Sequence, residues 1–381
     1  MNSTHTRTRA RSRTRRATAA ASAALVLAGI VTAAGPATAA TACTPRIQVL
    51  GSTGTGGYQV GGPQAEGVLG LGSGNLSVGL SGGRPVYWTG TRLHKVPLPE
   101  SAAAGAVLAV NKGGLMVGAV LGADGYLFTY RQGDAAVTRL PGSDFLSTDA
   151  DVNDAGYVVS GTGTGRGAVW KDGLKVRDLP VPAGAAPGTR IDTVTGINNR
   201  GDVLGMARED YEVPETGGHL EGTFPVLWPA DGGPAQALGR TSNESRVQDL
   251  DESGRVVGYD WNGMGYRYLP VTWAPPHPGS ASYPGVLKTH PYGTLEAISP
   301  TTNVSVGTAR FHPDEQTLPD QAQLWPGTGP VLALPRLAAH RASAASSVAD
   351  DGRVGGAAVN AAGTLKPVIW TCAAKQAYLP A

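Results

Sequence analysis

The sequence repeats one short pattern: an apolar residue, then Asn, Asp or small polar residues, a Gly, a β-branched pair and a second Gly. Clear copies begin at Val110, Val152, Ile197, Leu250 and Val348, and weaker copies cover residues 71–79 and 298–307. Asn or Asp near Gly supplies the positive φ and the local hydrogen bonds of a hairpin turn. Each copy therefore predicts two short strands joined by a tight turn.

Two further signals follow the turn pattern in a fixed order. The first is an apolar segment, often beginning with Pro-Val, that closes on Trp88, Tyr130, Trp170, Trp228, Trp273, Trp325 or Trp370. The second is a short segment ending in Leu-Pro or Leu-Gly, at 98–99, 140–141, 179–180, 238–239, 334–335 and 379–380. Each unit thus predicts four strands. We expect the in-register aromatic residues to be core residues wedged between neighbouring units.

The units are spaced at about 39 to 53 residues, which is the range of a propeller blade. The 381-residue chain can bury a large core, and its 55 Gly and 28 Pro favour many short elements. A β-sandwich or β-solenoid also uses short strands, but a sandwich gives no reason for the signals to recur in order. We therefore expect an all-β fold, a single β-propeller of about seven four-stranded blades.

This repeated wording resembles the HAF-repeat proteins of secreted bacterial type. Units of that family carry Ile-Asn-x-x-Gly-x-Val-x-Gly followed by His-Ala-Phe-x-Trp, and the resemblance covers residues 64–380. The turn pattern carries it, whereas no unit keeps the His-Ala-Phe residues and Pro-Val commonly stands there instead. The resemblance implies a secreted repeat module, and it implies no settled activity and no functional residue.

The first 39 residues have the layout of an export signal. An Arg-rich start precedes an apolar stretch over residues 19–34 and the small residues 37–39 before the expected cleavage point. A transmembrane anchor is the alternative, but the stretch is short, rich in Ala and Gly, and has no stop-transfer flank. We expect a secreted protein, with 40–63 as an entry segment that holds a ring-closing strand and 64–381 as the repeat domain.

The net charge argues against nucleic acid as a partner. Removing the six arginines of the first sixteen residues from the formal charge of +2 leaves −4, and no Lys/Arg run follows residue 40. Such a chain has no general attraction for phosphate backbones. No later segment is apolar enough to span a membrane, and we expect a monomer.

The two cysteines, Cys43 and Cys372, lie near opposite ends of the chain. In an exported protein such an isolated pair predicts one disulfide, which requires the two ends to meet and fits a closed ring of blades. A lipid-modified Cys43 is the alternative, although residues 40–42 lack the bulky apolar residue of such signals.

The longest connections between second and third strands belong to three consecutive units, at 206–223, 259–269 and 308–321. Function is disproportionately carried by variable loops on a rigid scaffold. Aromatic, carboxylate and arginine side chains there suit a glycan or protein ligand. The candidate binding residues are Arg208, Asp210, Tyr211, His219, Asp260, Trp261, Tyr266, Arg267, Tyr268, Arg310, His312 and Asp314. Alternatively, these loops pack on one another and cover the rim.

Signals for metal or catalytic chemistry are weaker. Asp249, Asp251, Ser253 and Asp260 have the spacing of a calcium loop, but the same stretch is one copy of the repeated turn. Calcium apart, no cofactor is expected. We predict non-catalytic binding of an extracellular glycan or protein. The alternative is a hydrolase or lyase that uses carboxylates of the same loops.

Overall fold

The computed structural model describes the backbone of residues 43–60, 64–100, 102, 104–122, 125–143, 149–162, 164–213, 218–241, 245–261, 268–277, 279, 281–311 and 317–381. Side chains are described over the same ranges except 211–213 and 218–220. The expected signal peptide lies outside these ranges, so secretion and the cleavage point stay predictions. Within them, no helix is both long and apolar enough to cross a membrane.

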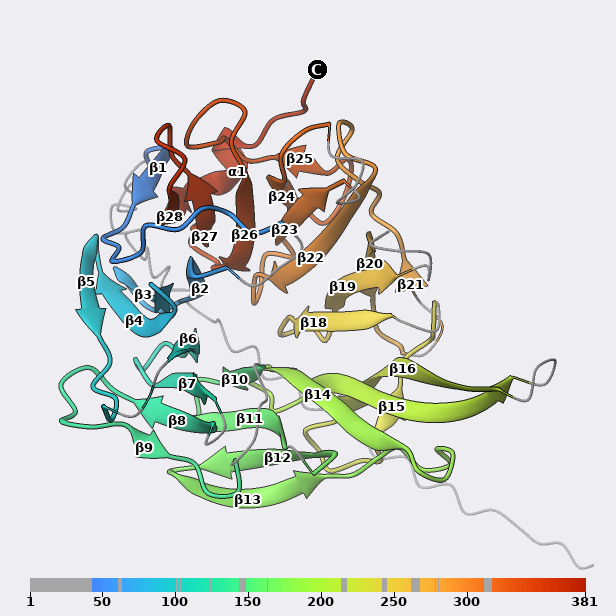
Figure 1. Cartoon of the computed structure of the whole chain (residues 1–381). Coiled ribbons are helices and arrows are strands. Elements are labelled where there is room, and N and C mark those ends of the chain that lie inside the picture. Colours follow the sequence, from blue (N-terminus) through green and yellow to red (C-terminus); the bar gives the residue numbers. More distant parts are fainter. Residues whose placement is uncertain are drawn as a thin grey trace, which may run out of the picture. The chain divides into compact units, whose positions relative to one another are not determined.

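Seven four-stranded antiparallel sheets follow one another along the described chain (Figure 1). Blades 1 to 3 are β2 (Glu66–Leu71), β3 (Leu76–Ser81), β4 (Arg84–Thr89) and β5 (Arg92–Lys95); β6 (Ala104–Val110), β7 (Met116–Leu121), β8 (Tyr126–Tyr130) and β9 (Thr138–Arg139); and β10 (Ala150–Val152), β11 (Tyr157–Thr162), β12 (Arg166–Lys171) and β13 (Leu174–Leu179).

The remaining four blades continue in chain order. They are β14 (Arg190–Ile197), β15 (Val203–Val213), β16 (Gly218–Trp228) and β17 (Gln236–Ala237); β18 (Arg246–Leu250), β19 (Val256–Trp261), β20 (Tyr268–Trp273) and β21 (Ala281–Ser282); β22 (Tyr292–Ile298), β23 (Ser305–Arg310), β24 (Gln321–Trp325) and β25 (Leu332–Ala333); and β26 (Ser343–Val348), β27 (Val354–Val359) and β28 (Leu365–Thr371) with β1 (Arg46–Val49). The predicted all-β propeller with seven four-stranded blades is confirmed.

The ring is closed by the N-terminal strand and by a disulfide. β1 is the outermost strand of the last sheet and pairs antiparallel with β28, from Arg46 opposite Thr371 to Val49 opposite Val368. Cys43 and Cys372 form the predicted disulfide with their Cα atoms 5.9 Å apart. β2 also contacts β26, β27 and β28, so the first and last blades are neighbours.

One copy of the Leu-Pro signal was assigned wrongly. The sequence suggested that the segment ending at residues 379–380 is the fourth strand of the last blade, but β1 takes that place. After β28 the chain instead forms the short helix α1 (Ala373–Gln376), and Tyr378 makes an isolated bridge to Ala333 of β25. The copy that belongs to the last blade is Leu50-Gly51, directly after β1.

Five in-register tryptophans tie consecutive blades by the same hydrogen bond, which we call the indole latch. Each indole Nε1–H donates to a backbone carbonyl of the preceding blade, at 2.7 to 2.9 Å, and the acceptor residue directly follows the leucine at the end of that blade's outer strand. The pairs are Trp88 with Gly51, Trp170 with Pro141, Trp228 with Pro180, Trp273 with Gly239, and Trp370 with Pro335. These indoles are at most 3% exposed. Trp325 differs, because it is half-buried and bonds to Gly329 of its own blade.

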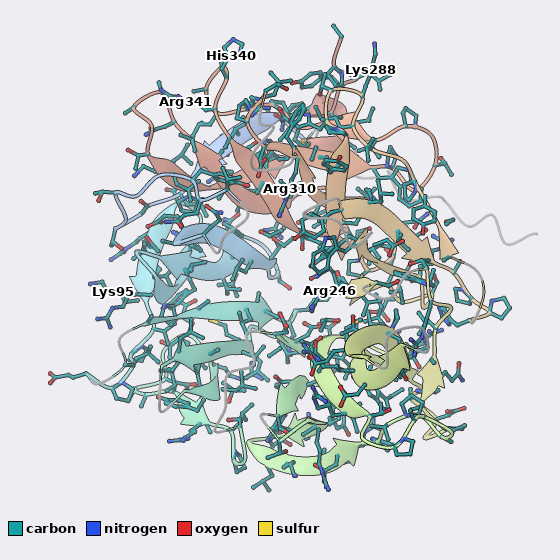
Figure 2. The ribbon with its side chains drawn as sticks, turned by 45° about the vertical axis from the view of Figure 1, so that its right-hand side comes forward. Lys95, Arg246, Lys288, Arg310, His340 and Arg341 are labelled. Atoms are coloured by element: carbon teal, nitrogen blue, oxygen red, sulfur yellow. A yellow bond between two sulfur atoms is a disulfide. The ribbon has the colours of Figure 1, made fainter. Side chains whose placement is uncertain are left out.

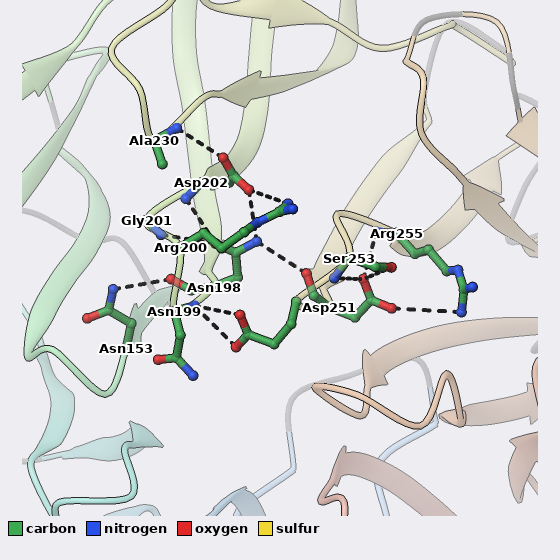
Figure 3. Close-up of polar contacts among 11 residues, drawn as sticks. Asn153, Asn198, Asn199, Arg200, Gly201, Asp202, Ala230, Asp251, Ser253 and Arg255 are labelled. Carbon is green, nitrogen blue, oxygen red and sulfur yellow. Dashed lines mark hydrogen bonds and ion pairs between the residues drawn. The ribbon is translucent and has the colours of Figure 1, made fainter. Parts of the chain in front are cut away.

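The turns between first and second strands are joined by a second set of bonds, the asparagine ladder (Asn111, Asn153, Asn198 and Asp251). Figure 3 shows its part from Asn153 to Asp251. The side-chain amides of the three asparagines each donate to the backbone carbonyl of the next member, at 2.8 to 3.2 Å. Their Oδ1 atoms, and that of Asp251, accept backbone N–H groups within their own turns. The side chains of the four ladder residues, in blades 2 to 5, therefore already have hydrogen-bond partners within the protein.

The disulfide should contribute measurably to stability, because it restricts an unfolded chain over a sequence separation of 329 residues. Replacing Cys43 and Cys372 together by Ser should lower the free energy of unfolding by about 2–5 kcal/mol. Guanidinium denaturation followed by tryptophan fluorescence measures this loss. An unchanged midpoint would contradict the role assigned to the bridge.

The asparagine ladder predicts a contrast between two Asn-to-Ala replacements. Asn153→Ala removes a buried donor to Asn198 and the acceptor for the Tyr157 N–H, and should cost about 1–3 kcal/mol of unfolding free energy. Asn75→Ala is the control, because this exposed turn side chain makes no hydrogen bond within the described structure. Its effect should stay within about 0.5 kcal/mol. Equal losses in the two variants would exclude a stabilising ladder.

Candidate ligand-binding site

The seven inner strands surround a central cavity of 630 Å³. All of them except β10 have a β-bulge two residues before their last residue. The bulged residues are Leu69, Leu108, Thr195, Gln248, Glu296 and Ser346, and every one of them lines the cavity. Because a bulge re-aims a side chain, the residue at this one position of each blade helps to set the chemistry of the channel.

The cavity lining is strongly acidic. It holds two cations, Lys112 and Arg353, against eight carboxylates: Asp149, Asp151, Asp154, Asp249, Glu252, Glu296, Asp350 and Asp351. Two of these carboxylates hold neighbouring blades together. Asp151 accepts the N–H of Ile197 in the next blade at 2.9 Å, and Asp249 accepts that of Ile298 at 2.9 Å.

The electrostatic state of Asp249 follows from its place in the channel. Burial raises its pKa, the nearby charge of Asp151 raises it further, and the N–H groups of Ile298 and Leu250 partly oppose the shift. The outcome is a pKa of about 8. Burial also raises the pKa of Asp151. These two carboxyls are therefore structural bridges in a crowded acidic channel.

The structure does not bring the predicted calcium ligands together. Asp251 Oδ1 accepts the N–H groups of Ser253 and Arg255 and the Ser253 hydroxyl, as the hairpin interpretation requires. Asp260 Oδ2 accepts the hydroxyl of Tyr283 at 2.8 Å. Among the residues that the structure describes, no three His, Cys, Asp or Glu side chains are grouped to hold a metal ion.

The end of the channel opposite the asparagine ladder carries a group of charged and aromatic side chains. We define the mouth cluster as Asp192 (β14), Arg246 (β18), Tyr259 (β19), Glu296 (β22) and Arg310 (β23). Asp192 and Arg246 lie near the starts of inner strands and Tyr259 and Arg310 near the ends of second strands, whereas Glu296 lies farther along its inner strand and is the one member that also lines the 630 Å³ cavity. Arg246 lies 3.7 Å from Asp192, and Arg310 lies 3.9 Å from Glu296. The cluster therefore spans blades 4 to 6.

Tyr259 connects the two halves of the mouth cluster. Burial and the charge of Glu296 raise its pKa to about 12, whereas Arg246 and Arg310 act in the opposite direction. Its ring meets that of Tyr268 edge-on, with centroids 5.1 Å apart, and the Arg310 guanidinium lies 5.9 Å from the Tyr268 ring. Tyr259 is thus a neutral phenol, a hydrogen-bonding group beside two cations.

The long connection of blade 4 is a strand ribbon, not the loop that the sequence suggested. β15 and β16 stay paired out to Val213 and Gly218, and the ribbon projects from the blade (Figure 1). Arg208, Asp210, Tyr211 and His219 therefore lie on strands. The cross-strand partners Asp210 and Glu221 both approach Arg190, at 3.8 and 2.7 Å, which helps to explain why this segment pairs.

Arg208 binds the mouth cluster to the ribbon. It contacts Asp192 at 2.6 Å and Glu221 at 2.7 Å. Although burial disfavours its charge, hydrogen bonds with Glu221 and Asp192 raise the pKa of Arg208. Because Arg208 takes Asp192 at such short range, the longer contact of Asp192 with Arg246 is the weaker one.

The entry segment forms one wall of the mouth. After β1 it crosses the last blade toward blade 6 (Figure 1), and Gly56 accepts the backbone N–H of Leu365 at 2.9 Å. The Tyr58 hydroxyl then donates to Asp320 Oδ2 at 2.8 Å. Burial and Asp320 raise the pKa of Tyr58, and the charge of Asp320 also acts on Arg310.

The predicted binding residues have different outcomes. Arg310 and Tyr268 meet, and Arg208 joins the same charged network through Asp192. Asp260 is buried and engaged with Tyr283, while Trp261 packs 6.4 Å from Tyr268. The predictions for Tyr266, Arg267, His312 and Asp314 fall outside the described residues, and nothing tests them.

Sequence reasoning missed five residues of this region: Tyr58, Asp192, Arg246, Tyr259 and Glu296. The predicted binding residues all came from connections between second and third strands, whereas three of these five residues lie on inner strands. A usable signal was present, because Asp192 and Glu296 are carboxylates within segments that the repeat predicts to be inner strands. Tyr58 gave no comparable signal, since its role depends on the path of the entry segment across the ring.

Comparison with known proteins supports the fold alone. No protein-family model matches the chain, and no curated protein matches it in sequence. The HAF-repeat resemblance therefore stays a prediction. Among solved structures, the β-propeller domain of the Trilobed protease from Pyrococcus furiosus is 8% identical, with a TM-score of 0.52, covering 80% of this chain and 94% of that one.

Two further solved structures are similar over most of their length. The WD40 β-propeller domain of Doa1 is 12% identical, with a TM-score of 0.45, covering 86% of this chain and 97% of that one. BamB from Moraxella catarrhalis is 12% identical, with a TM-score of 0.39, covering 80% and 83%. The protease propeller is described as having an open velcro topology, whereas here β1 pairs with β28.

The raised pKa of Asp249 predicts a specific pH dependence of stability. The unfolded chain releases this proton near pH 4, but the folded chain keeps it up to about pH 8, so the contribution of Asp249 to stability falls as pH rises between those values. The melting temperature of the wild type minus that of Asp249→Asn should therefore fall from pH 5 to pH 8. A value that rises with pH would show that the charged form is the stabilised one.

Proposed function

We propose that this chain is a secreted, non-catalytic β-propeller that binds an extracellular glycan at the mouth cluster. The observation that carries the proposal is the contrast between the two ends of the channel. At the turn end, the asparagine ladder uses the polar groups for bonds between blades. At the mouth, Arg246, Tyr259 and Arg310 make no hydrogen bond through their side chains within the described protein.

The chemistry of the mouth fits a sugar. Sugar rings present C–H faces that pack on aromatic side chains, and hydroxyls that both donate and accept hydrogen bonds. Tyr259 and Tyr268 supply two rings, Glu296 and Asp192 supply acceptors, and the two arginines supply donors. Tyr58 is bonded to Asp320 and interacts electrostatically with Arg310 and Glu296, so blades 4 to 6 and the N-terminal chain all contribute to the cluster.

Two of the loop carboxylates that the hydrolase alternative would use are engaged by protein groups. Glu209 is paired with Arg240, and Asp260 is buried against Tyr283. A carboxylate used in glycoside chemistry must be available to its substrate. The secreted location is supported by the layout of residues 1–39 and fits the Cys43–Cys372 disulfide, because such bonds persist in oxidising compartments.

A binding screen tests this proposal. The full chain would be applied to an array of bacterial and plant cell-wall glycans, and Tyr259→Ala and Tyr268→Ala should each weaken the binding found by about tenfold, because each removes a packing surface. Tyr157→Ala is the control, since Tyr157 is an exposed tyrosine on blade 3 away from the mouth. Melting curves of each variant confirm that the fold is intact.

Two results would reject the assignment. One is a chain that binds no glycan on the array. The other is glycan binding that survives both mouth replacements unchanged, which would place the site elsewhere.

A further inference from the structure

We infer that the glycan bound at the mouth carries carboxylate groups and that Arg246 and Arg310 bind them. This inference rests on the proposed function and narrows its ligand to acidic, carboxylated polysaccharides. Both arginines lie in the inner part of the ring. Figure 2 shows Arg246 and Arg310 toward the centre of the ring, whereas Lys95, Lys288, His340 and Arg341 lie at its periphery.

Arg310 is held in place without being neutralised by a close partner. Its side chain is only 25% exposed, its nearest carboxylate is Glu296 at 3.9 Å, and its Nε atom is buried without a hydrogen-bond partner. At 3.9 Å the contact with Glu296 is too long for a hydrogen bond. An arginine prefers two parallel bonds to one carboxylate, and no described protein group supplies them here.

A second buried polar atom close to Arg310 is also without a partner. Asp320 is 1% exposed, and its Oδ1 atom has no hydrogen-bond partner although Oδ2 accepts from Tyr58. Leaving buried polar groups unpaired is costly, so such groups in a folded protein need an explanation. A ligand carboxylate that accepts from the Arg310 guanidinium would supply the close partner that this cation lacks.

Arg246 repeats the pattern in blade 5. Its side chain is 36% exposed, and its only ion-pair partner in the described structure is Asp192 at 3.7 Å. Asp192 is bound at much shorter range by Arg208, through both Nη2 at 2.6 Å and Nε at 2.8 Å. The guanidinium of Arg246 therefore keeps its hydrogen-bonding capacity for another acceptor.

The neighbouring acids select among anions. Asp192, Glu296 and Asp149 would repel a densely charged sulfated or phosphorylated polymer, but they accept hydrogen bonds from sugar hydroxyls. A carboxylated sugar combines one moderate negative charge with several hydroxyl donors. Its carboxylate can accept hydrogen bonds from the two arginines, and its hydroxyls can donate to the acidic side chains. An acidic peptide offers carboxylates but few hydroxyls, and it matches only the arginines.

The test compares polymers that differ only in charge. Polygalacturonate, alginate and hyaluronan would each be measured beside its carboxyl-reduced, neutral counterpart. Dextran sulfate serves as a dense polyanion and poly-glutamate as an acidic peptide, with EDTA present to exclude metal bridges. Affinity electrophoresis or calorimetry gives the dissociation constants. At least one carboxylated polymer should bind ten or more times tighter than its reduced form and than dextran sulfate.

Matched variants then assign the arginines. Arg246→Gln and Arg310→Gln should each weaken binding of that polymer by about tenfold or more, while Lys95→Gln and Lys288→Gln, which remove the same charge at the periphery, should leave it unchanged. Arg310→Lys should only partly restore binding, because lysine lacks the planar fork. If Arg310→Gln fails to fold, the more exposed Arg246→Gln carries the test.

The outcomes separate this inference from the proposed function. Equal binding of reduced polymers, or binding insensitive to both arginine variants, overturns the inference and leaves a neutral-glycan site. Equal or tighter binding of dextran sulfate, or selective binding of poly-glutamate, also overturns it. If no glycan binds at all, the proposed function fails as well.

Discussion

The hydrogen bonds between blades are the constraint on which the rest of this structure depends. A four-stranded sheet buries its faces only against neighbours, so a propeller is stable only when each blade is fixed to the next. Here the indole latch fixes the third strand of one blade to the chain leaving the preceding blade, and the asparagine ladder fixes the turns. At the join, Trp88 bonds to Gly51 of the N-terminal segment, so the same bond that links the other blades also closes the ring.

These inter-blade bonds give the molecule two unlike ends. At the turn end, the ladder residues of blades 2 to 5 are hydrogen-bonded from one blade to the next. The mouth end varies from blade to blade, and it combines the paired ribbon of blade 4, the arginines of blades 5 and 6, and Tyr58 from the entry segment. A rigid ring with one committed end and one variable end can change its ligand without changing its stability. We place the binding site at the mouth for this reason.

Most of the fold could be predicted from the sequence, because repeated packing positions impose repeated residues. Trp170 and Pro141 illustrate this, since each is recognisable as part of a periodic signal and the two are bonded in the structure. The last blade could not be completed in this way. Its outer strand lies at the other end of the chain, and Leu379-Pro380 imitated the expected signal while Leu50-Gly51 was the true copy. The disulfide could be predicted because two cysteines allow only one pairing.

The candidate site was predicted less completely, for a physical reason. Arg310 and Tyr268 could be predicted because they lie at strand ends, next to connections of variable length. Asp192, Arg246 and Glu296 belong to inner strands, and only the closed ring shows that residues of different blades, such as Asp192 and Arg246, meet. Tyr58 joins them through a path across the ring that no periodicity encodes. The repeated residues of the sequence therefore predict the scaffold, whereas the candidate site consists of residues that differ from blade to blade.

The most direct test of this division is hydrogen–deuterium exchange of the full chain with and without a saturating acidic oligosaccharide selected by the binding measurements. Exchange should slow in the strands 246–250, 256–261, 292–298 and 305–310, which carry Arg246, Tyr259, Glu296 and Arg310, with no change in the turns of the asparagine ladder. Protection confined to those turns, or to the outer strands, would contradict it.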